Sequence, residues 1–159
     1  MRGAFRTRWD AVSGCSRVAV GVCVFLLWVL YPPAGSADRF DGSQPLECAV
    51  ARGRQFHANG TSTPFDPESV GLPRAFTLDF RHNRVLPAKE SVVRRQSRIK
   101  RTEHIENLLI LQGVDDGVDG VNDGVGWTMA IEKSDGTFVI GAAGDAIGYL
   151  VFGQCKVQP

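Results

Sequence analysis

The stretch from Gly126 to Cys155 constrains the fold more than any other part of the chain. Apolar and polar residues alternate along it, and Ser134-Asp135-Gly136 stands where a hairpin would need a turn. Trp127, Met129 and Ile131 fall on one face of a strand, because successive side chains of a strand point to opposite sides. The pattern therefore predicts neighbouring antiparallel strands.

The last strand of this stretch is apolar on both faces. Ile147, Tyr149 and Val151 share one face, and Leu150 and Phe152 lie on the other. One face would point into the core. The two large apolar residues on the opposite face predict burial on that side as well.

Shorter segments upstream also have strand patterns. The clearest places Phe76, Leu78 and Phe80 on one face and polar residues on the other. The predicted strands are Leu46–Ala51, Ala75–Arg81, Arg84–Leu86 and Ser91–Val93.

The segment from Thr102 to Gln112 fits two interpretations. Ile105, Leu108, Leu109 and Gln112 form a helical stripe that would end at Gly113. Residues 107–111 are equally consistent with a buried strand of ordinary length. We favour the strand because its neighbours are predicted to be strands.

Two stretches predict turns or loops. Asn59-Gly60 suits the positive backbone dihedrals of a type I′ hairpin turn. Residues 63–73 include three prolines and a glycine, and proline has no N–H to donate to a strand ladder. Six to eight short strands with turns at this spacing indicate an all-β domain, either a small antiparallel β-sandwich or a barrel.

Residues 1–37 have the three parts of a secretory signal peptide. A basic segment precedes the uncharged apolar run Val18–Tyr31, and small residues follow Pro32-Pro33. We predict cleavage after Ala37, a flexible leader over residues 38–45 and a single β domain over residues 46–159. The product would be exported to a periplasmic or extracellular location, without a stable membrane span. An uncleaved membrane anchor is the alternative.

The cysteines predict one disulfide that closes the domain. Cys15 and Cys23 would leave with the signal peptide, whereas Cys48 and Cys155 would remain near the two ends of the exported chain. A single pair in an exported domain indicates a bridge. Two cysteines so far apart lack the paired spacing of a metal site, so we predict no metal and no cofactor.

The net charge of the predicted exported chain limits the classes of partner that it could bind. Four of the 18 basic residues and one of the 17 acidic residues lie in the signal segment, which leaves a net charge of −2. That near-neutral balance argues against nucleic acid as a partner. A local basic cluster could instead bind an anionic surface or an acidic protein, or pair with acidic residues of its own chain. This candidate anion-binding surface comprises Arg94, Arg95, Arg98, Lys100 and Arg101.

Three local motifs suggest binding or modification. The acidic, glycine-rich stretch from Asp115 to Gly124 resembles a calcium loop, but neither register places oxygen ligands at the positions that an EF-hand needs. Asn59-Gly60-Thr61 would be a glycosylation acceptor in a eukaryotic secretory pathway. There, the basic residues ending at Arg101 would also be a processing site.

The sequence supports a non-enzymatic function better than catalysis. No nucleophile-elbow or zinc-protease motif occurs, and the bridged cysteines leave no thiolate to act as a nucleophile. We therefore assign no catalytic residue and expect an exported binding, inhibitor or envelope-associated module of unknown ligand. The alternative is a small secreted hydrolase with an irregular active site near Asp79 and His82.

Overall fold

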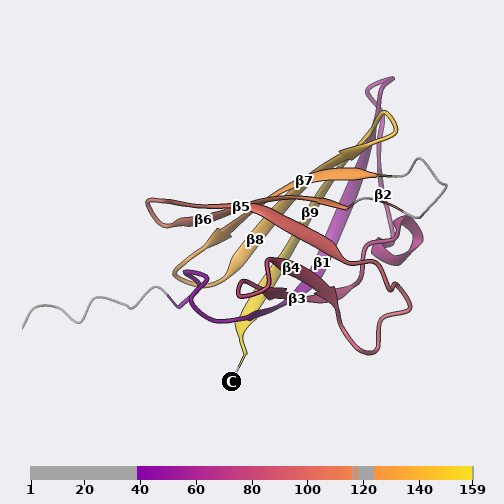
Figure 1. Cartoon of the computed structure of the whole chain (residues 1–159). Coiled ribbons are helices and arrows are strands. Elements are labelled where there is room, and N and C mark those ends of the chain that lie inside the picture. Colours follow the sequence, from indigo (N-terminus) through magenta and orange to yellow (C-terminus); the bar gives the residue numbers. More distant parts are fainter. Residues whose placement is uncertain (1–38, 116, 118–123, 159) are drawn as a thin grey trace, which may run out of the picture. The chain divides into compact units, whose positions relative to one another are not determined.

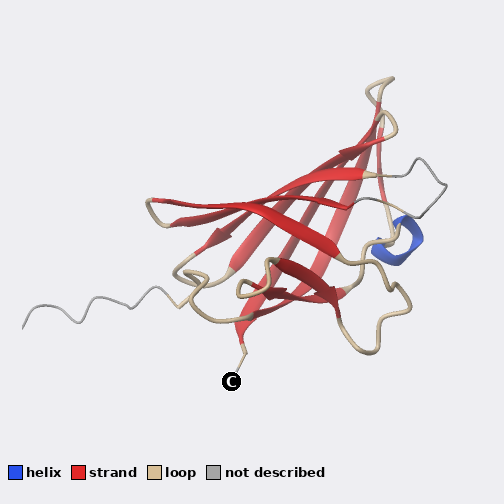
Figure 2. Ribbon diagram, in the orientation of Figure 1, coloured by secondary structure: helices blue, strands red, loops and turns tan. Residues whose placement is uncertain are grey.

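A computed structural model describes residues 39–115, 117 and 124–158. Strands make up most of this part of the chain, and its helical structure is one short 3₁₀ turn (Figure 1, Figure 2). None of the described helical residues forms a span long and apolar enough to cross a membrane. The elements are β1 (Leu46–His57), β2 (Ser62–Pro64), η1 (Pro67–Val70), β3 (Ala75–Asp79), β4 (Arg84–Pro87), β5 (Ser97–Ile105), β6 (Leu108–Asp115), β7 (Val125–Glu132), β8 (Thr137–Gly144) and β9 (Ile147–Val157).

The strands form a closed antiparallel barrel of eight strands. They follow the order β1-β3-β4-β5-β6-β7-β8-β9, and β9 pairs with β1 to complete the circle. The first half of β1 pairs with β3 and its second half with the short β2, while β9 pairs along its whole length. The predicted all-β fold is confirmed, and the barrel is the correct one of its two predicted forms. Closure satisfies the edge hydrogen bonds that an open sheet would expose.

Large apolar side chains fill one half of the barrel. Residues that alternate along each strand point inward, among them Met129 and Ile131, which the sequence placed on one face. Phe138 is fully buried, and its ring packs edge-to-face against Phe76 with centroids 5.8 Å apart. Other fully buried residues of this core are Leu46, Leu78, Leu109 and Leu111.

Phe40 closes the core at this end. Its side chain is buried, and its ring lies so close to Gly136 that a Cβ there would fall 2.5 Å from it. The positive φ of 79° at Gly136 belongs to the turn between β7 and β8. The segment predicted to be a flexible leader over residues 38–45 is therefore anchored to the barrel at Phe40.

The predicted disulfide joins Cys48 to Cys155. The two residues lie directly opposite each other on β1 and β9, and both are buried. The bridge therefore crosses the pair of strands at which the first and last parts of the barrel meet. It closes a loop with a sequence separation of 107 residues.

The hairpin at Asn59-Gly60 is present, but its turn is not type I′. Gly60 has a φ of 83°, whereas Asn59 does not have the positive φ that type I′ requires. Instead, the Oδ1 of Asn59 accepts hydrogen bonds from the N–H and the hydroxyl of Thr61, at 3.0 and 2.7 Å. This side-chain bonding holds Asn59 in an ordinary backbone conformation.

Other local predictions need correction. Residues 91–93 form no strand, because the N–H of Val93 bonds the hydroxyl of Ser91 rather than a neighbouring strand. The segment 63–73 includes the end of β2 and the turn η1 as well as loop. Phe152 faces outward and is 36% exposed, so the second buried face predicted for β9 is wrong there.

The strand interpretation of residues 102–112 is correct, but the segment spans two strands. β5 ends at Ile105 and β6 begins at Leu108, with Glu106 at a φ of 49° in the turn between them.

The predicted signal peptide and its cleavage site lie outside the described residues. So does most of the acidic stretch tested for calcium binding, because the structure describes only 115, 117 and 124 of it.

Candidate ligand-binding cavity

The second half of the barrel has small residues at inward positions. Gly53, Gly113 and Ala142 stand where the first half has Phe, Leu and Ile side chains, and Ser97 begins β5. An eight-stranded barrel is just wide enough for side chains to fill it or for one small ligand to enter. Aromatic rings lie over the two glycines, and the space that remains in this half is lined by Ser97 and Ala142 among others.

A largely apolar cavity occupies this half. Its volume is about 120 Å³. Its wall combines inward-facing strand residues with residues of η1 and the segment after it. The apolar lining includes Val70, Leu72, Val85, Met129, Ile140 and Val151.

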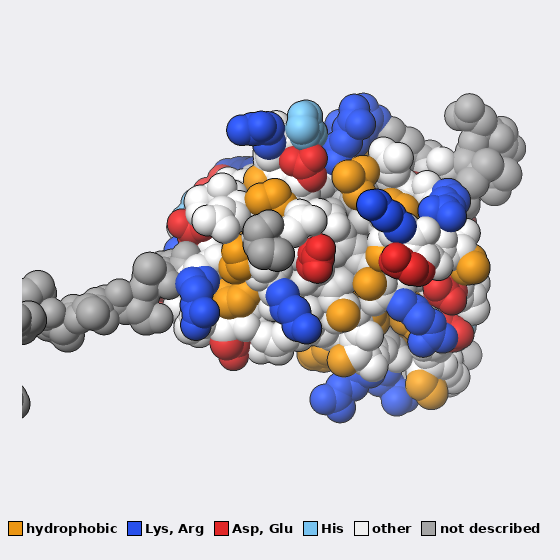
Figure 3. Space-filling model, turned by 90° about the horizontal axis from the view of Figure 1, so that it is seen from below, with side chains coloured by type: hydrophobic (Ala, Val, Ile, Leu, Met, Phe, Trp, Pro, Cys, Tyr) orange, Lys and Arg blue, Asp and Glu red, His pale blue; other side chains and the backbone are white. Residues whose placement is uncertain are grey.

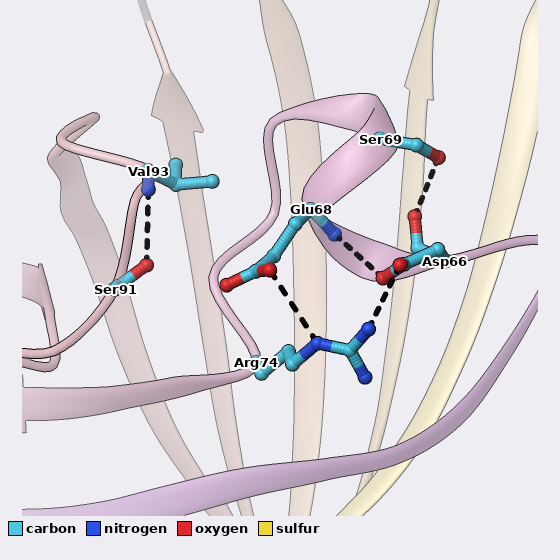
Figure 4. Close-up of polar contacts among 6 residues, drawn as sticks. All are labelled: Asp66, Glu68, Ser69, Arg74, Ser91 and Val93. Carbon is cyan, nitrogen blue, oxygen red and sulfur yellow. Dashed lines mark hydrogen bonds and ion pairs between the residues drawn. The ribbon is translucent and has the colours of Figure 1, made fainter.

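Phe65 and η1 cover one side of the cavity. The ring of Phe65 lies over Gly53, where a Cβ would fall 2.6 Å from it, and meets Tyr149 edge-to-face at 5.5 Å. Asp66 caps η1 by accepting a hydrogen bond from the N–H of Glu68, and Arg74 forms an ion pair with Asp66 at 2.8 Å (Figure 4). These local contacts hold the covering segment in place.

Three polar side chains meet in the wall of the cavity. Arg95 donates to the Oδ1 of Asp115 through Nε at 3.2 Å and Nη2 at 2.8 Å. The hydroxyl of Ser97 donates to the Oδ2 of the same carboxylate at 3.2 Å. The side chains of Arg95 and Asp115 are only 23% and 15% exposed. The opposite charges of Arg95 and Asp115 balance each other within this group of three side chains.

The indole N–H of Trp127 is a hydrogen-bond donor without a partner among the described residues. Trp127 pairs with Gly113 in the β6–β7 register, and a Cβ at that glycine would lie 2.1 Å from the indole ring. The ring lines the cavity, and its Nε1 is buried with no hydrogen-bond partner in the part of the chain that the structure describes. Buried indole N–H groups usually have a partner. The indole N–H of Trp127 is therefore an exception among the described residues.

The chain matches no protein-family model, no curated protein and no solved structure. The case for a site therefore rests on the geometry of the barrel. Within residues 39–115, 117 and 124–158, no group of three or more His, Cys, Asp or Glu side chains could hold a metal ion.

The structure places the five residues of the predicted anion-binding cluster in different surroundings. Arg95 turns into the cavity wall toward Asp115, whereas the exposed Arg101 forms an ion pair with Glu103 at 2.6 Å. Arg94 donates to the backbone oxygen of Lys89 at 3.3 Å. Arg98 and Lys100 are exposed on β5. Binding of an anionic partner by this surface stays a prediction.

The side of the molecule on which β3 and β4 lie carries charges of both signs. Figure 3 shows this side from below, with basic and acidic side chains interspersed among apolar ones. A groove outside the barrel is lined there by residues of β1, β3, β4 and β9, including Glu47, Asp79 and Lys156. Mixed charge of this kind points to no single class of ligand.

Asp79 and His82 form a local pair beside the groove. The Nδ1 of His82 lies 2.7 Å from the Oδ2 of Asp79, and the imidazole is 63% exposed. Among the described residues, no serine hydroxyl forms a hydrogen bond with His82. His57 lies on β1 and His104 on β5, outside this pair. The hydrolase alternative stays a prediction without a nucleophile placed beside the pair.

The same pair predicts a titration effect. The hydrogen bond from His82 holds the pKa of the Asp79 carboxyl below its usual value. We expect His82→Ala to raise that pKa toward 3.8, the ordinary value, in a carboxyl-carbon NMR titration. The Asp79 contribution to stability exists above the unfolded-state pKa and disappears as the pH falls through the folded-state pKa. An unchanged titration in His82→Ala would contradict the assignment of the hydrogen bond as the cause.

Proposed function

We propose that the chain is an exported, non-enzymatic binding protein that holds a small, mainly apolar ligand inside its barrel. The observation that carries the proposal is the cavity itself, which is lined by apolar side chains and a few polar groups. This combination is typical of small-molecule sites. Export is supported by the signal pattern and by the buried disulfide, since such bridges persist in oxidising compartments.

The volume limits the ligand. An engineered cavity of about 150 Å³ is sufficient for benzene in another protein. The cavity of about 120 Å³ is smaller than this, so a single ring or a short branched chain is the largest ligand that we expect it to hold. A long acyl chain or a polycyclic molecule would need the barrel to open.

Tryptophan fluorescence tests the proposal. The chain has three tryptophans, Trp9, Trp28 and Trp127, so the full chain with Trp9→Phe and Trp28→Phe reports on the cavity wall alone. We expect single-ring compounds such as toluene to shift or quench this emission in a saturable way. The reason is that they would lie against the indole ring.

A matched pair of variants separates binding in the cavity from binding at the surface. Ala142 lines the cavity from β8, whereas the next residue, Ala143, is exposed. Ala142→Leu should abolish the saturable change because its side chain fills the cavity, and Ala143→Leu should leave it intact. Equal loss in both variants, or no saturable change in the parent, would refute the proposal.

A further inference from the structure

We propose that ligands enter and leave the cavity beneath residues 66–74, which form a cover that opens about its two attachments while the barrel stays closed. This inference rests on the proposed function and adds the route by which the cavity exchanges its contents. Figure 2 shows η1, the short helix of this cover, beside the barrel. Val70, Leu72 and Pro73 of the cover line the cavity.

The cover is attached to the barrel at its two ends. At the first end, the N–H of Phe65 donates to the backbone oxygen of Gly53 at 3.4 Å, and at the second, the N–H of Val50 donates to the backbone oxygen of Arg74 at 2.8 Å. In the described part of the chain, the residues between these two bonds form no hydrogen bond with a strand. Apolar packing, in which Leu72 contacts the core, therefore holds the cover against the barrel.

The polar contacts inside the cover make it a self-contained unit. The N–H of Ser69 donates to the backbone oxygen of Asp66 at 3.0 Å. Arg74 forms ion pairs with Asp66 at 2.8 Å and with Glu68 at 3.5 Å, and these contacts close the neck of the loop (Figure 4). Compact surface loops whose ends lie close together are frequently functional. The cover can therefore move as one body about its neck without losing its internal hydrogen bonds.

The rest of the barrel wall is harder to open. The shortest ladder between the described strands of the barrel joins β4 to β5, with the two residue pairs Arg84–Arg98 and Val85–Ser97. Opening this seam would break backbone hydrogen bonds of the barrel, whereas opening the cover breaks none of them. The other half of the interior is filled by the core, and Phe40 closes it.

A thiol placed in the cavity tests the route without any ligand. In the full chain with Cys15→Ala and Cys23→Ala, Val151→Cys supplies one free thiol at a position that lines the cavity and is 2% exposed. The rate at which methyl methanethiosulfonate, a small neutral thiol reagent, modifies this cysteine measures how often the cavity opens. Mass spectrometry follows the reaction. Ile131→Cys places the thiol in the filled half instead, and it should react much more slowly.

A matched pair of substitutions then tests the cover itself. Asp66→Asn removes the ion pair with Arg74 but keeps the side-chain oxygen that caps η1. We expect it to raise the labelling rate of Val151→Cys about two- to fivefold, the effect of losing an exposed ion pair. Glu103→Gln breaks the exposed ion pair with Arg101 on β5, away from the cover, and should leave the rate unchanged.

Two outcomes would overturn the inference. Equal labelling rates in the Asp66→Asn and Glu103→Gln chains would point to another route, such as the seam between β4 and β5. Equal rates for Val151→Cys and Ile131→Cys would mean that the thiol reacts only when the whole barrel unfolds. If Val151→Cys does not fold, Ala142→Cys supplies a cavity thiol from another strand.

A single-ring compound separates this inference from the proposed function. Toluene should slow the labelling of the cavity thiol, because a bound molecule occupies the space that the reagent must enter. A labelling rate that depends on the cover but not on toluene would support the route and contradict the proposed ligand. A rate that depends on toluene but not on the cover would do the reverse.

Discussion

Replacing Cys48 and Cys155 together by alanine should lower the melting temperature of the protein by about 10–20 °C. The bridge spans 107 residues, so the chain-entropy model assigns it up to about 4–5 kcal/mol, and the loss of a native disulfide from a small secreted domain typically costs about 2–5 kcal/mol. The effect should be large here because the bridge joins β1 to β9, the strands that close the barrel. Differential scanning calorimetry measures it.

The control for this experiment keeps the bridge. Cys15→Ala with Cys23→Ala removes the other two cysteines of the chain and should leave the melting temperature unchanged. Both bridged cysteines are buried, so a reductant should act fully only when the protein is partly unfolded during exposure. A double variant that melts at the parent temperature would show that barrel closure does not depend on the disulfide.

Gly153→Ala should destabilise the barrel by about 2–3 kcal/mol, because the interior has no room for one more methyl group. A Cβ at this position would lie 2.2 Å from the backbone oxygen of Ala49 and 2.4 Å from the ring of Phe138. The oxygen belongs to the neighbouring strand and the ring is fully buried, so neither can move without disturbing the core. Urea unfolding followed by circular dichroism gives the free energy of unfolding.

Gly141→Ala is the matched control. Gly141 lies on β8 with no atom within 4 Å of the position that a Cβ would take, and neither glycine has a positive φ. Alanine there should leave stability unchanged or raise it slightly, because it reduces the freedom of the unfolded chain. Equal destabilisation by the two substitutions would show that the contacts with Phe138 and the Ala49 oxygen do not determine the cost.

Much of the fold could be predicted because its signal is local. Alternation placed Trp127, Met129 and Ile131 on one face, and these residues do point into the barrel. The failures occurred where a side chain competes with the expected backbone pattern. Ser91 bonds its own neighbouring N–H in place of a strand partner, and Asn59 supports its turn by a side-chain bond.

Less of the candidate site could be predicted from the sequence. The basic residues around Arg95 predicted an outward-facing surface, yet Arg95 reaches a carboxylate 20 residues further along the chain and lines the interior. The sequence placed Trp127 on the same strand face as Met129, but its position over Gly113 depends on the pairing of β6 with β7. The order of residues within β6 or within β7 alone does not reveal that Trp127 lies over Gly113.

The sequence by itself indicated that the chain forms a β domain and that Cys48 and Cys155 pair, because strand alternation is readable along the chain and the other two cysteines lie in the predicted signal peptide. Tertiary structure alone decided that the sheet closes into a barrel, since closure depends on β9 meeting β1. It also decided where the interior is full and where it is hollow. A cavity is a property of the side chains that meet from several strands, and here the rings of Phe65 and Trp127 lie over Gly53 and Gly113 and line the space together with Ala142.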